Sequence, residues 1–359
     1  MATATQDIID REEEGQATLS EIWFTRCPVP TATGLAYRRG WLDEAFGQAG
    51  IKVRTLQEES GPLRHHHYDH RLPTLVREGG NILAIAARAQ GEPTKLVGLT
   101  WIEERQAILV RPGSGIASAA DLKGRKLGLP TWTDHEIASH ARGSSIARGM
   151  SLAGYKGALA SAWLTLDDVE LVEVESRRRV SADADAGRLR QLWALQDLAD
   201  GKVDALYVKG AAAVDGARAA GVKVGIDLDA LPDKRFRVNN GTPRPITVHE
   251  TLIEEHFDHL VTFLEQTLRA AIWARDNLSD VLTVLEGETR GSRSAVEEAY
   301  GNGFHTTLHP DLSDERLALF EQQKRFLWVH GFLERDFALA SWVDRRPLEA
   351  AWERIHARP

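Results

Sequence analysis

The sequence predicts an α/β protein built from two lobes, and three features of the chain indicate this. Short apolar segments typical of strands alternate with longer segments of helical spacing, which is the pattern of strand–helix–strand units. A turn rich in glycine and proline, Arg111–Gly115, separates a first set of these elements from a second set. The chain then crosses back near Val222–Asp227, so the second set is inserted into the first.

The first lobe begins with a predicted strand over Glu21–Phe24. Apolar residues then recur at helical spacing, which predicts an amphipathic helix over Gly34–Ala49. The elements that follow are a strand over Ile51–Leu56, a short helix over Leu72–Glu78, an apolar strand over Asn81–Ala87 and a strand over Lys95–Ile102. Strands separated by helices in this way favour an open, doubly wound sheet.

The second lobe follows the segment Ala107–Val110. Its predicted elements are a short helix from Ser118 running into a strand that ends at Leu129, a helix over Ala138–Leu152, a strand over Val169–Val174, a charged loop over Glu175–Arg179, a helix over Arg188–Asp200 and a strand over Val203–Val208. Helical spacing returns near the end of the chain, over Glu250–Leu278, Arg293–Ala299 and Asp314–Val329. The sequence therefore predicts a helical C-terminal tail.

These patterns set the expected domain boundaries. Lobe 1 is expected to contain residues 19–110 and 226–359, and lobe 2 residues 111–225, each with a mixed sheet flanked by helices. The acidic segment 1–18 is expected to form a loosely attached or disordered head. Two lobes joined by two crossing segments enclose a cleft, and small-ligand sites lie in such clefts near the carboxyl ends of strands.

The composition excludes several classes of partner. The chain has 359 residues and a net charge of −8, and its basic residues are scattered, which argues against nucleic acid as a partner. No segment approaches the roughly 20 apolar residues of a membrane span. The first twenty residues lack the basic and apolar regions of a signal peptide, so we expect a cytoplasmic protein, and we expect a monomer.

Cys27 is the only cysteine of the chain, and it lies where the first predicted strand gives way to a loop. A lone cysteine cannot form an internal disulfide, and such residues are often small buried apolar groups. Here Arg26 precedes it, and a segment rich in histidine and arginine, Arg64–Arg71, follows about forty residues later. Because cationic neighbours favour the reactive thiolate, Cys27 is a candidate catalytic residue.

No cofactor or metal is predicted. The four histidines among His65–His70 have spacings that could chelate a metal, but only Asp69 is available to complete a site. Gly113-x-Gly115 lacks the third glycine and the acidic residue of a dinucleotide site. The basic run Arg177–Arg179 is interpreted as a solvated loop or as an attractor for anions at the edge of the cleft.

A family resemblance rests on several motifs spread from near residue 20 to near residue 345. They are Cys27-Pro28-Val29-Pro30, His65-x-x-Tyr68-Asp69, Arg77-x-Gly79-Gly80-x-Ile82, Asp167-Asp168-Val169-Glu170-Leu171-Val172, Gly201-x-Val203-Asp204-Ala205-Leu206-Tyr207, Trp273-Ala274-Arg275-Asp276 and Leu317-Ala318-Leu319. With these motifs the chain resembles the hydroxybiphenyl sulfinate desulfinases of dibenzothiophene desulfurisation. That family lies within the periplasmic binding-protein type II superfamily, which also contains sulfonate-binding proteins.

The resemblance implies a two-lobed fold of that type and a reaction that releases sulfite from an aryl sulfinate without metal or organic cofactor. By motif, Cys27, His65 and Arg77 would be the catalytic residues, with the backbone N–H of Gly80 on a sulfinate oxygen. Arginine suits this group because a sulfinate presents two acceptor oxygens. Further substrate-binding positions expected beside them are Trp23, Phe24, Thr25 and Gly79.

Two departures from the family pattern affect these assignments. The segment between Tyr68-Asp69 and Arg77 is two residues longer here, so counting back from Arg77 selects His67, whereas the His-x-x-Tyr-Asp spacing selects His65. We expect His65 to be the catalytic histidine. The position where the family carries an aromatic residue over the substrate falls at or beside Met150, which indicates a pocket of another shape.

Two other functions compete with the desulfinase assignment. The first is a non-catalytic protein that binds a sulfonate, sulfinate or similar small anion for an importer or a sensor. The second is a pyrimidine-type biosynthetic enzyme of the same superfamily that consumes a histidine of its own, for which the histidine-rich segment His65–His70 would serve. Cys27 and the absence of a signal peptide favour the desulfinase, because a transport receptor needs export and no thiol.

Overall fold

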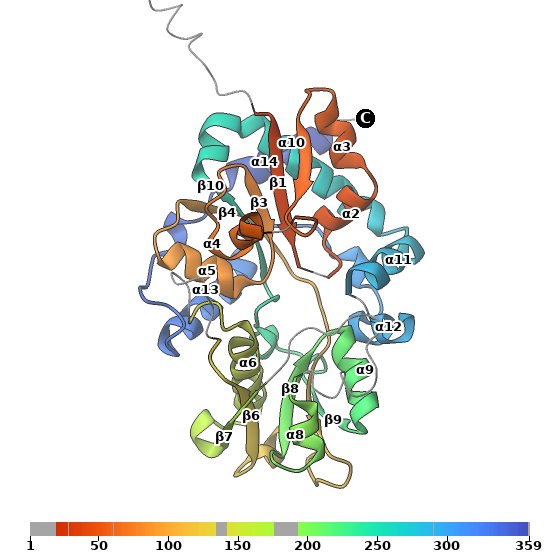
Figure 1. Ribbon diagram of the computed structural model, residues 1–359, viewed down its shortest axis with the longest axis vertical. Coiled ribbons are helices and arrows are strands. Elements are labelled where there is room, and N and C mark those ends of the chain that lie inside the picture. Colours follow the sequence, from red (N-terminus) through yellow and green to blue (C-terminus); the bar gives the residue numbers. More distant parts are fainter. Residues whose placement is uncertain are drawn as a thin grey trace, which may run out of the picture.

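The computed structural model describes residues 19–27, 29–59, 61–133, 142–175, 193–289 and 291–357. Within them, the strands form two five-stranded sheets, one in each of two lobes (Figure 1). The expected head over residues 1–18, the loop 177–179 and the first parts of the helices expected over 138–152 and 188–200 lie outside the described residues.

The sheet of lobe 1 has the strand order β2-β1-β3-β10-β4. Strands β1 and β2, and β1 and β3, are parallel, whereas β10 is antiparallel to β3 and β4. The strands are β1 (Glu21–Arg26), β2 (Lys52–Thr55), β3 (Leu75–Glu78), β4 (Thr94–Thr100) and β10 (Arg244–His249). The mixed sheet predicted from the sequence is confirmed.

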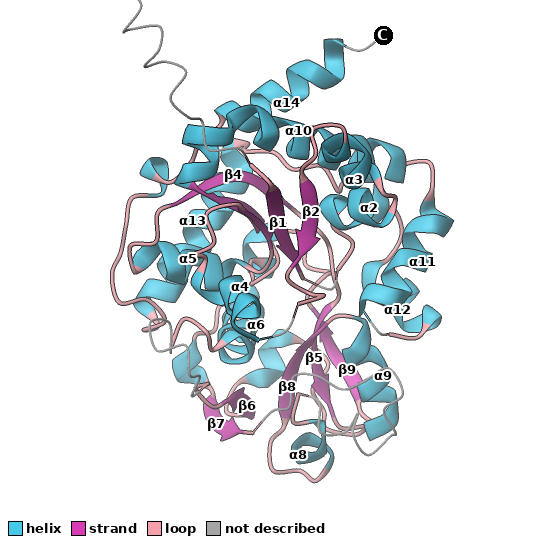
Figure 2. Ribbon diagram, turned by 45° about the horizontal axis from the view of Figure 1, so that its top comes forward, coloured by secondary structure: helices cyan, strands magenta, loops and turns pink. Residues whose placement is uncertain are grey.

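Helices cover both faces of this sheet (Figure 2). Phe24 packs on Tyr37 and Phe263, so α2 and α10 cover one face. Thr25 points to the other face, where it meets α4. The helices of this lobe are α2 (Ala32–Arg38), α3 (Trp41–Gly47), α4 (His66–Asp69), α5 (Asn81–Ala89), α10 (Glu250–Ala274), α11 (Leu278–Thr289), α12 (Arg293–Tyr300), α13 (Asp314–Val329) and α14 (Arg346–Ala357). The helical C-terminal tail is confirmed.

The sheet of lobe 2 has the strand order β7-β6-β8-β5-β9. Its strands are β5 (Gln106–Val110), β6 (Lys126–Pro130), β7 (Glu170–Val174), β8 (Ala205–Lys209) and β9 (Lys223–Asp227), and its helices are α6 (Ile146–Ser161), α8 (Leu195–Ala199) and α9 (Ala211–Ala220). Because β5 pairs with β8 and β9, the strand 106–110, which we had assigned to lobe 1, belongs to the sheet of lobe 2.

Three predicted elements differ from the structure. Residues 81–87 lie in the helix α5 and not in a strand. An apolar run that is buried on all sides fits both the two-residue repeat of a strand and the 3.6-residue repeat of a helix, so the pattern alone does not distinguish them. Residues 75–78 form the strand β3 and not part of a helix: Arg77 and Glu78 are both buried, so the charges do not mark an exposed helix face. The helix expected over 34–49 breaks into α2 and α3 at Gly40, whose φ of 76° is left-handed.

The lobes are joined by the segment between β4 and β5 and by the segment between β9 and β10. The second of these ends in the loop Asn239–Pro243, whose groups bond to both lobes. The side-chain amide of Asn81 in lobe 1 donates to the Asn239 and Pro243 carbonyls, at 2.6 and 2.8 Å. Asn239 Nδ2 in turn donates to the Met150 carbonyl and the Tyr207 hydroxyl in lobe 2. This loop therefore fixes the start of α5 relative to lobe 2.

Among the described residues, no helix is both long enough and apolar enough to cross a membrane.

Candidate active site at Cys27

Cys27 lies at the point where two neighbouring strands of lobe 1 end. Strands β1 and β3 are parallel and pair Thr25 with Arg77, so the residue after β1 lies beside the Gly79-Gly80 turn after β3. The Gly80 backbone N–H donates to the half-buried Cys27 Sγ at 3.2 Å. Gly80 is the N-cap of α5, and the positive end of the helix dipole therefore faces the sulfur.

Only glycine fits at position 80. A Cβ on Gly80 would lie 2.3 Å from the side-chain nitrogen of Asn240. That side chain cannot move away freely, because its Oδ1 accepts from the Ile82 N–H at 3.0 Å. The Gly-Gly motif therefore brings the backbone N–H close to the thiol by removing a side chain that would collide with the crossing loop.

Arg77 is almost completely buried, at 1% exposure, beneath the same turn. Its Nε donates to the His67 carbonyl at 3.2 Å and its Nη2 to the Gly80 carbonyl at 3.1 Å. Its Nη1 has no hydrogen-bond acceptor among the described residues. Burial lowers the pKa of Arg77 to about 10, while the negative charge of Cys27 acts to raise it, so the guanidinium stays charged at neutral pH. By reciprocity, Arg77 favours the thiolate of Cys27.

The structure places His67 at the site and His65 outside it. His67 Nδ1 lies 2.9 Å from the hydroxyl of Thr25, two residues before Cys27. His65 is exposed and ends the 3-10 turn Gly61–His65 just before α4. The turn and the short helix direct the third histidine of the run toward β1, and the first toward solvent. The geometry therefore favours the alternative register, His67, over the expected His65.

Thr25 itself is held by a second polar side chain. Gln57 Nε2 donates to the Thr25 hydroxyl at 2.8 Å and to the Arg26 carbonyl at 2.6 Å. The hydroxyl of Thr55 donates to the amide oxygen of Gln57, which fixes the orientation of the amide. Gln57 thus holds both Thr25 and the backbone next to Cys27, and the sequence analysis did not select it.

The other expected substrate-binding residues have structural roles. Phe24 is fully buried on the opposite face of the sheet. Trp23 is in a small apolar cluster with Leu56 and Leu75. The Gly79 N–H donates to the Pro245 carbonyl at 3.2 Å, and a Cβ there would lie 2.9 Å from the Arg77 guanidinium. Gly79 therefore leaves space for the Arg77 guanidinium. Phe24 and Trp23 point to opposite faces of the sheet, as successive strand residues do, and both are buried in apolar packing.

The remaining histidines of the run hold the local backbone. His66 Nδ1 pairs with Asp69 at 2.8 Å, and His70 Nδ1 bonds to the Tyr68 carbonyl at 3.0 Å. Across the part of the chain that the structure describes, no three His, Cys, Asp or Glu side chains gather as metal ligands would.

Two cationic residues near the site were missed by the sequence analysis. Arg244 begins β10 and is 3% exposed, and Lys209 ends β8 and is 8% exposed. Arg244 Nε and Nη1 have no acceptor among the described residues, and Lys209 Nζ pairs with Glu104 Oε2 at 3.5 Å. Nothing in the local sequence of either residue indicates burial, so only the fold brings them to the junction of the lobes.

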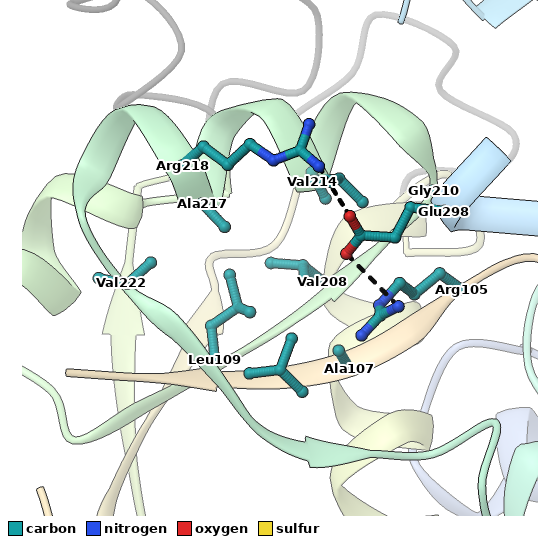
Figure 3. A pocket seen from close by; sticks show the side chains of 12 residues that line it. Arg105, Ala107, Leu109, Val208, Gly210, Val214, Ala217, Arg218, Val222 and Glu298 are labelled. Atoms are coloured by element: carbon teal, nitrogen blue, oxygen red, sulfur yellow. Dashed lines mark hydrogen bonds and ion pairs between the residues drawn. The ribbon is translucent and has the colours of Figure 1, made fainter. Parts of the chain in front are cut away.

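A separate cavity lies between the sheet and α9 of lobe 2, with Glu298 of α12 from lobe 1 at its edge, and we call it the lobe-2 pocket (Figure 3). Its apolar walls come from β5, β8, β9 and α9, and its charged residues are Arg105, Arg218 and Glu298. Glu298 bonds to Arg218 Nη2 at 2.8 Å and pairs with Arg105 Nη1 at 3.5 Å. None of Cys27, His67 and Arg77 lines it.

Comparison with known proteins agrees with the geometry at Cys27. The 2'-hydroxybiphenyl-2-sulfinate desulfinase of Rhodococcus erythropolis is 30% identical to this chain, over 92% of this chain and 93% of the relative. The chain belongs to this desulfinase family. Residues 35–141 also match the family model described as NMT1/THI5 like.

Solved structures give the same result for the desulfinase family. The chain is 28% identical to the desulfurization enzyme DSZB, solved as a Cys→Ser mutant in complex with biphenyl-2-sulfinic acid, with a TM-score of 0.73 over 93% of this chain and 99% of that one. The periplasmic aliphatic sulphonate binding protein SsuA from Escherichia coli matches with 16% identity and a TM-score of 0.63, over 91% of this chain and 92% of that one. The periplasmic-binding-protein type II-like fold expected from the sequence is confirmed.

Proposed function

We propose that this protein is a sulfinate desulfinase that cleaves the carbon–sulfur bond of an aryl or other organic sulfinate and releases sulfite. One observation carries the proposal: a thiol, an arginine with an unused N–H group and a histidine converge at the carboxyl ends of β1 and β3. The desulfinase relative carries 2'-hydroxybiphenyl-2-sulfinate in its name, and a related structure holds biphenyl-2-sulfinic acid.

The site supplies the groups that a sulfinate needs. Its two oxygens accept hydrogen bonds, and the candidate donors are Arg77 Nη1, which has no acceptor among the described residues, and the Gly80 N–H, which lies beside Cys27. Arg77 is already oriented by the His67 and Gly80 carbonyls, so little rotamer entropy is lost when it binds the anion. This preorganised charge favours a compact anion.

The overall reaction adds water across the carbon–sulfur bond: the ring carbon gains a proton, and the sulfur leaves as hydrogen sulfite. Two routes use Cys27. In the first, the thiolate attacks the sulfinate sulfur, the aryl carbanion leaves and is protonated, and water then releases hydrogen sulfite from the sulfur–sulfur adduct. In the second, the thiol protonates the ring carbon, sulfur dioxide leaves and is hydrated, and the proton released on hydration returns to the thiolate.

His67 is assigned the proton-handling role in either route. The Thr25 hydroxyl at Nδ1 and the amide of Gln57 behind it restrict the imidazole to one orientation. We assign to this imidazole the exchange of a proton with the thiol or with water. A proton transfer by a positioned side chain contributes roughly 10²–10⁴ in rate.

The test is sulfite release by purified protein from a panel of aryl and alkyl sulfinates, measured with a thiol-independent sulfite assay. Turnover of at least one sulfinate, with the desulfonylated hydrocarbon formed in equal amount, supports the proposal. Binding of sulfinates without any sulfite release would overturn it and leave the anion-binding function, which the likeness to sulphonate-binding proteins makes the second candidate.

Location and assembly complete the proposal. A thiol-dependent enzyme with one cysteine suits a reducing compartment, where thiols are kept free, so we propose that it works in the cytoplasm as a monomer. Cell fractionation and size-exclusion chromatography with light scattering test these two points.

A further inference from the structure

Three buried cationic side chains meet where the lobes join. Arg77 comes from β3, Arg244 from the start of β10 and Lys209 from the end of β8, and they are 1%, 3% and 8% exposed. Burying a charge is costly unless it is paired and hydrogen-bonded. Lys209 has Glu104 at 3.5 Å, but Arg77 Nη1 and Arg244 Nε and Nη1 have no acceptor among the described residues.

The head groups of Arg244 and Lys209 lie side by side. A Cβ on Gly241 would come within 2.7 Å of Arg244 Nη2 and 3.0 Å of Lys209 Nζ, so both cover the same bare glycine. Gly241 belongs to the crossing loop Asn239–Pro243, which is held by hydrogen bonds to both lobes. The position of the pair is therefore fixed by the fold.

The three cations influence one another. Burial is the main cause that lowers the pKa of Lys209; the Glu104 carboxylate opposes this change, and the Arg244 charge adds to it. Burial likewise lowers the pKa of Arg77; Cys27 opposes this change, and the Arg244 charge adds to it. Like charges held together in a buried site repel, and a bound anion relieves that repulsion.

Arg77 connects this pair to the reacting thiol. It contacts the turn beside Cys27 through Gly80 and lies within electrostatic reach of Arg244. The crossing loop gives a second connection: Gly80, whose N–H donates to Cys27, lies against Asn240, and the next residue, Gly241, lies against Arg244 and Lys209. The Arg244–Lys209 pair is therefore one loop residue away from the position that contacts the turn beside Cys27.

We propose that Arg244 and Lys209 bind a second anionic group of the sulfinate substrate, such as a carboxylate on its organic part. This rests on the desulfinase function proposed above, and it narrows the substrate class to sulfinates that carry a second acidic group. Arg244 offers a planar fork of N–H donors and Lys209 a compact charge, which together match a carboxylate with two acceptor oxygens.

The experiment compares kcat/KM for benzenesulfinate with that for its 2-, 3- and 4-carboxy derivatives. We expect at least one carboxylated isomer to exceed benzenesulfinate in the wild type. In Arg244→Gln and in Lys209→Gln, this preference should fall about tenfold to a hundredfold, the range expected for charge-assisted hydrogen bonds. A ratio of two substrates is insensitive to a partial loss of folded protein, so a destabilised variant still gives a result.

The matched control is Arg237→Gln. Arg237 is also buried at the lobe junction, at 9% exposure, but its Nη1 is paired with Glu103 at 2.6 Å. Its substitution should lower stability and leave the substrate ratio unchanged. Equal loss of preference in this control would mean that the effect arises from packing, and would overturn the proposal.

The remaining outcomes separate this inference from the proposed function. Sulfite release from benzenesulfinate with no preference for any carboxylated isomer overturns the second binding group alone. If no sulfinate is turned over, the desulfinase function fails. Calorimetry with the same four compounds then tests the second binding group, because the ratio of the affinity for each carboxylated isomer to that for benzenesulfinate replaces the ratio of kcat/KM values. Inorganic sulfate is added as a competitor. If it inhibits the turnover of benzenesulfinate and of the carboxylated isomers equally, Arg244 and Lys209 bind a separate inorganic anion and not a group of the substrate, and the proposal is overturned.

Discussion

Two groups of arginines lie near the junction of the lobes, and they are neutralised differently. At the lobe-2 pocket, one carboxylate, Glu298, pairs with both Arg105 and Arg218 (Figure 3). Near Cys27, Arg77 and Arg244 are more deeply buried, yet each keeps N–H groups without an acceptor among the described residues.

The difference separates the structural role of one group from the binding role that we propose for the other. Glu298 lies on α12 and its partner Arg218 on α9, so their ion pair joins the two lobes. Within this pair the two charges neutralise each other. Donors that stay buried and unsatisfied cost free energy in the unliganded protein, and this cost is recovered when a ligand supplies the acceptors. The larger effects of substitution on turnover should therefore fall on the group near Cys27.

The largest effect is expected for Cys27→Ser. The hydroxyl is nearly isosteric with the thiol, but it is a far weaker acid and nucleophile, so sulfite release should fall by about 10³ or more. The fold and the binding of a sulfinate, measured by circular dichroism and calorimetry, should be retained. Activity within tenfold of the wild type would refute the catalytic role of Cys27.

Second in size is His67→Ala, which should lower kcat by roughly 10²–10⁴ through loss of the proton-handling group. The matched control is His65→Ala, two residues away and exposed, which should stay within about twofold because it lacks the contact with Thr25. Steady-state kinetics over pH 5–9 checks both. The reverse pattern would restore the assignment made from the His-x-x-Tyr-Asp spacing.

The histidine shows what the sequence could and could not predict. The sequence predicts a strand over Glu21–Phe24, just before Cys27, and β1 extends over Glu21–Arg26, because this apolar pattern is local. The choice between His65 and His67 depends on how a 3-10 turn and a four-residue helix direct their side chains, which spacing alone does not encode.

Burial of charge was the second limit. Arg77 and Glu78 made the strand β3 resemble an amphipathic helix, although both side chains are inside the protein. Arg244 and Lys209 are far apart in sequence and meet only because β8 and β10 end at the lobe junction. By contrast, the helix over Asp314–Val329 was predicted with the bounds it has, since its caps and apolar spacing are local.

Third, Arg77→Lys should weaken sulfinate binding about thirtyfold, near 2 kcal/mol. A lysine keeps the charge but cannot bond two carbonyls and a ligand in one plane, and charge-assisted hydrogen bonds are worth ~1.5–3 kcal/mol each. Calorimetry with Cys27→Ser as the background measures affinity without turnover. Unchanged affinity would place Arg77 outside the binding site.

A smaller effect on stability is expected at Asp229, in the second crossing segment. Burial raises the pKa of Asp229 to about 7 in the folded protein, and the charges of Asp227 and Glu103 act in the same direction. The pKa of an aspartate in the unfolded chain is about 4, so the folded state keeps the proton up to a higher pH than the unfolded state does. The free energy of unfolding therefore falls as the pH rises from about 4 to about 7.

Asp229→Asn removes this titration and keeps an oxygen for the Gln106 N–H, which donates to the Asp229 carboxylate at 3.0 Å. Relative to the wild type, the variant should therefore gain about 1 kcal/mol or more in free energy of unfolding between pH 5 and pH 8, since one pKa unit corresponds to ~1.36 kcal/mol. Urea unfolding at the two pH values measures the difference. A constant difference would mean that Asp229 is ionised throughout.

The smallest effect is expected for Glu298→Gln at the lobe-2 pocket. Its two pairs are partly exposed and screened by solvent, so the free energy of unfolding should fall by only about 0.5 kcal/mol. The control is Glu315→Gln, which removes a single exposed pair with Lys234 and should change stability even less. Because Glu298 neutralises its arginines within the protein, the KM for sulfinates should not change. A threefold or larger change in KM would show that this pocket communicates with the site at Cys27, and the contrast between the two groups of arginines would fail.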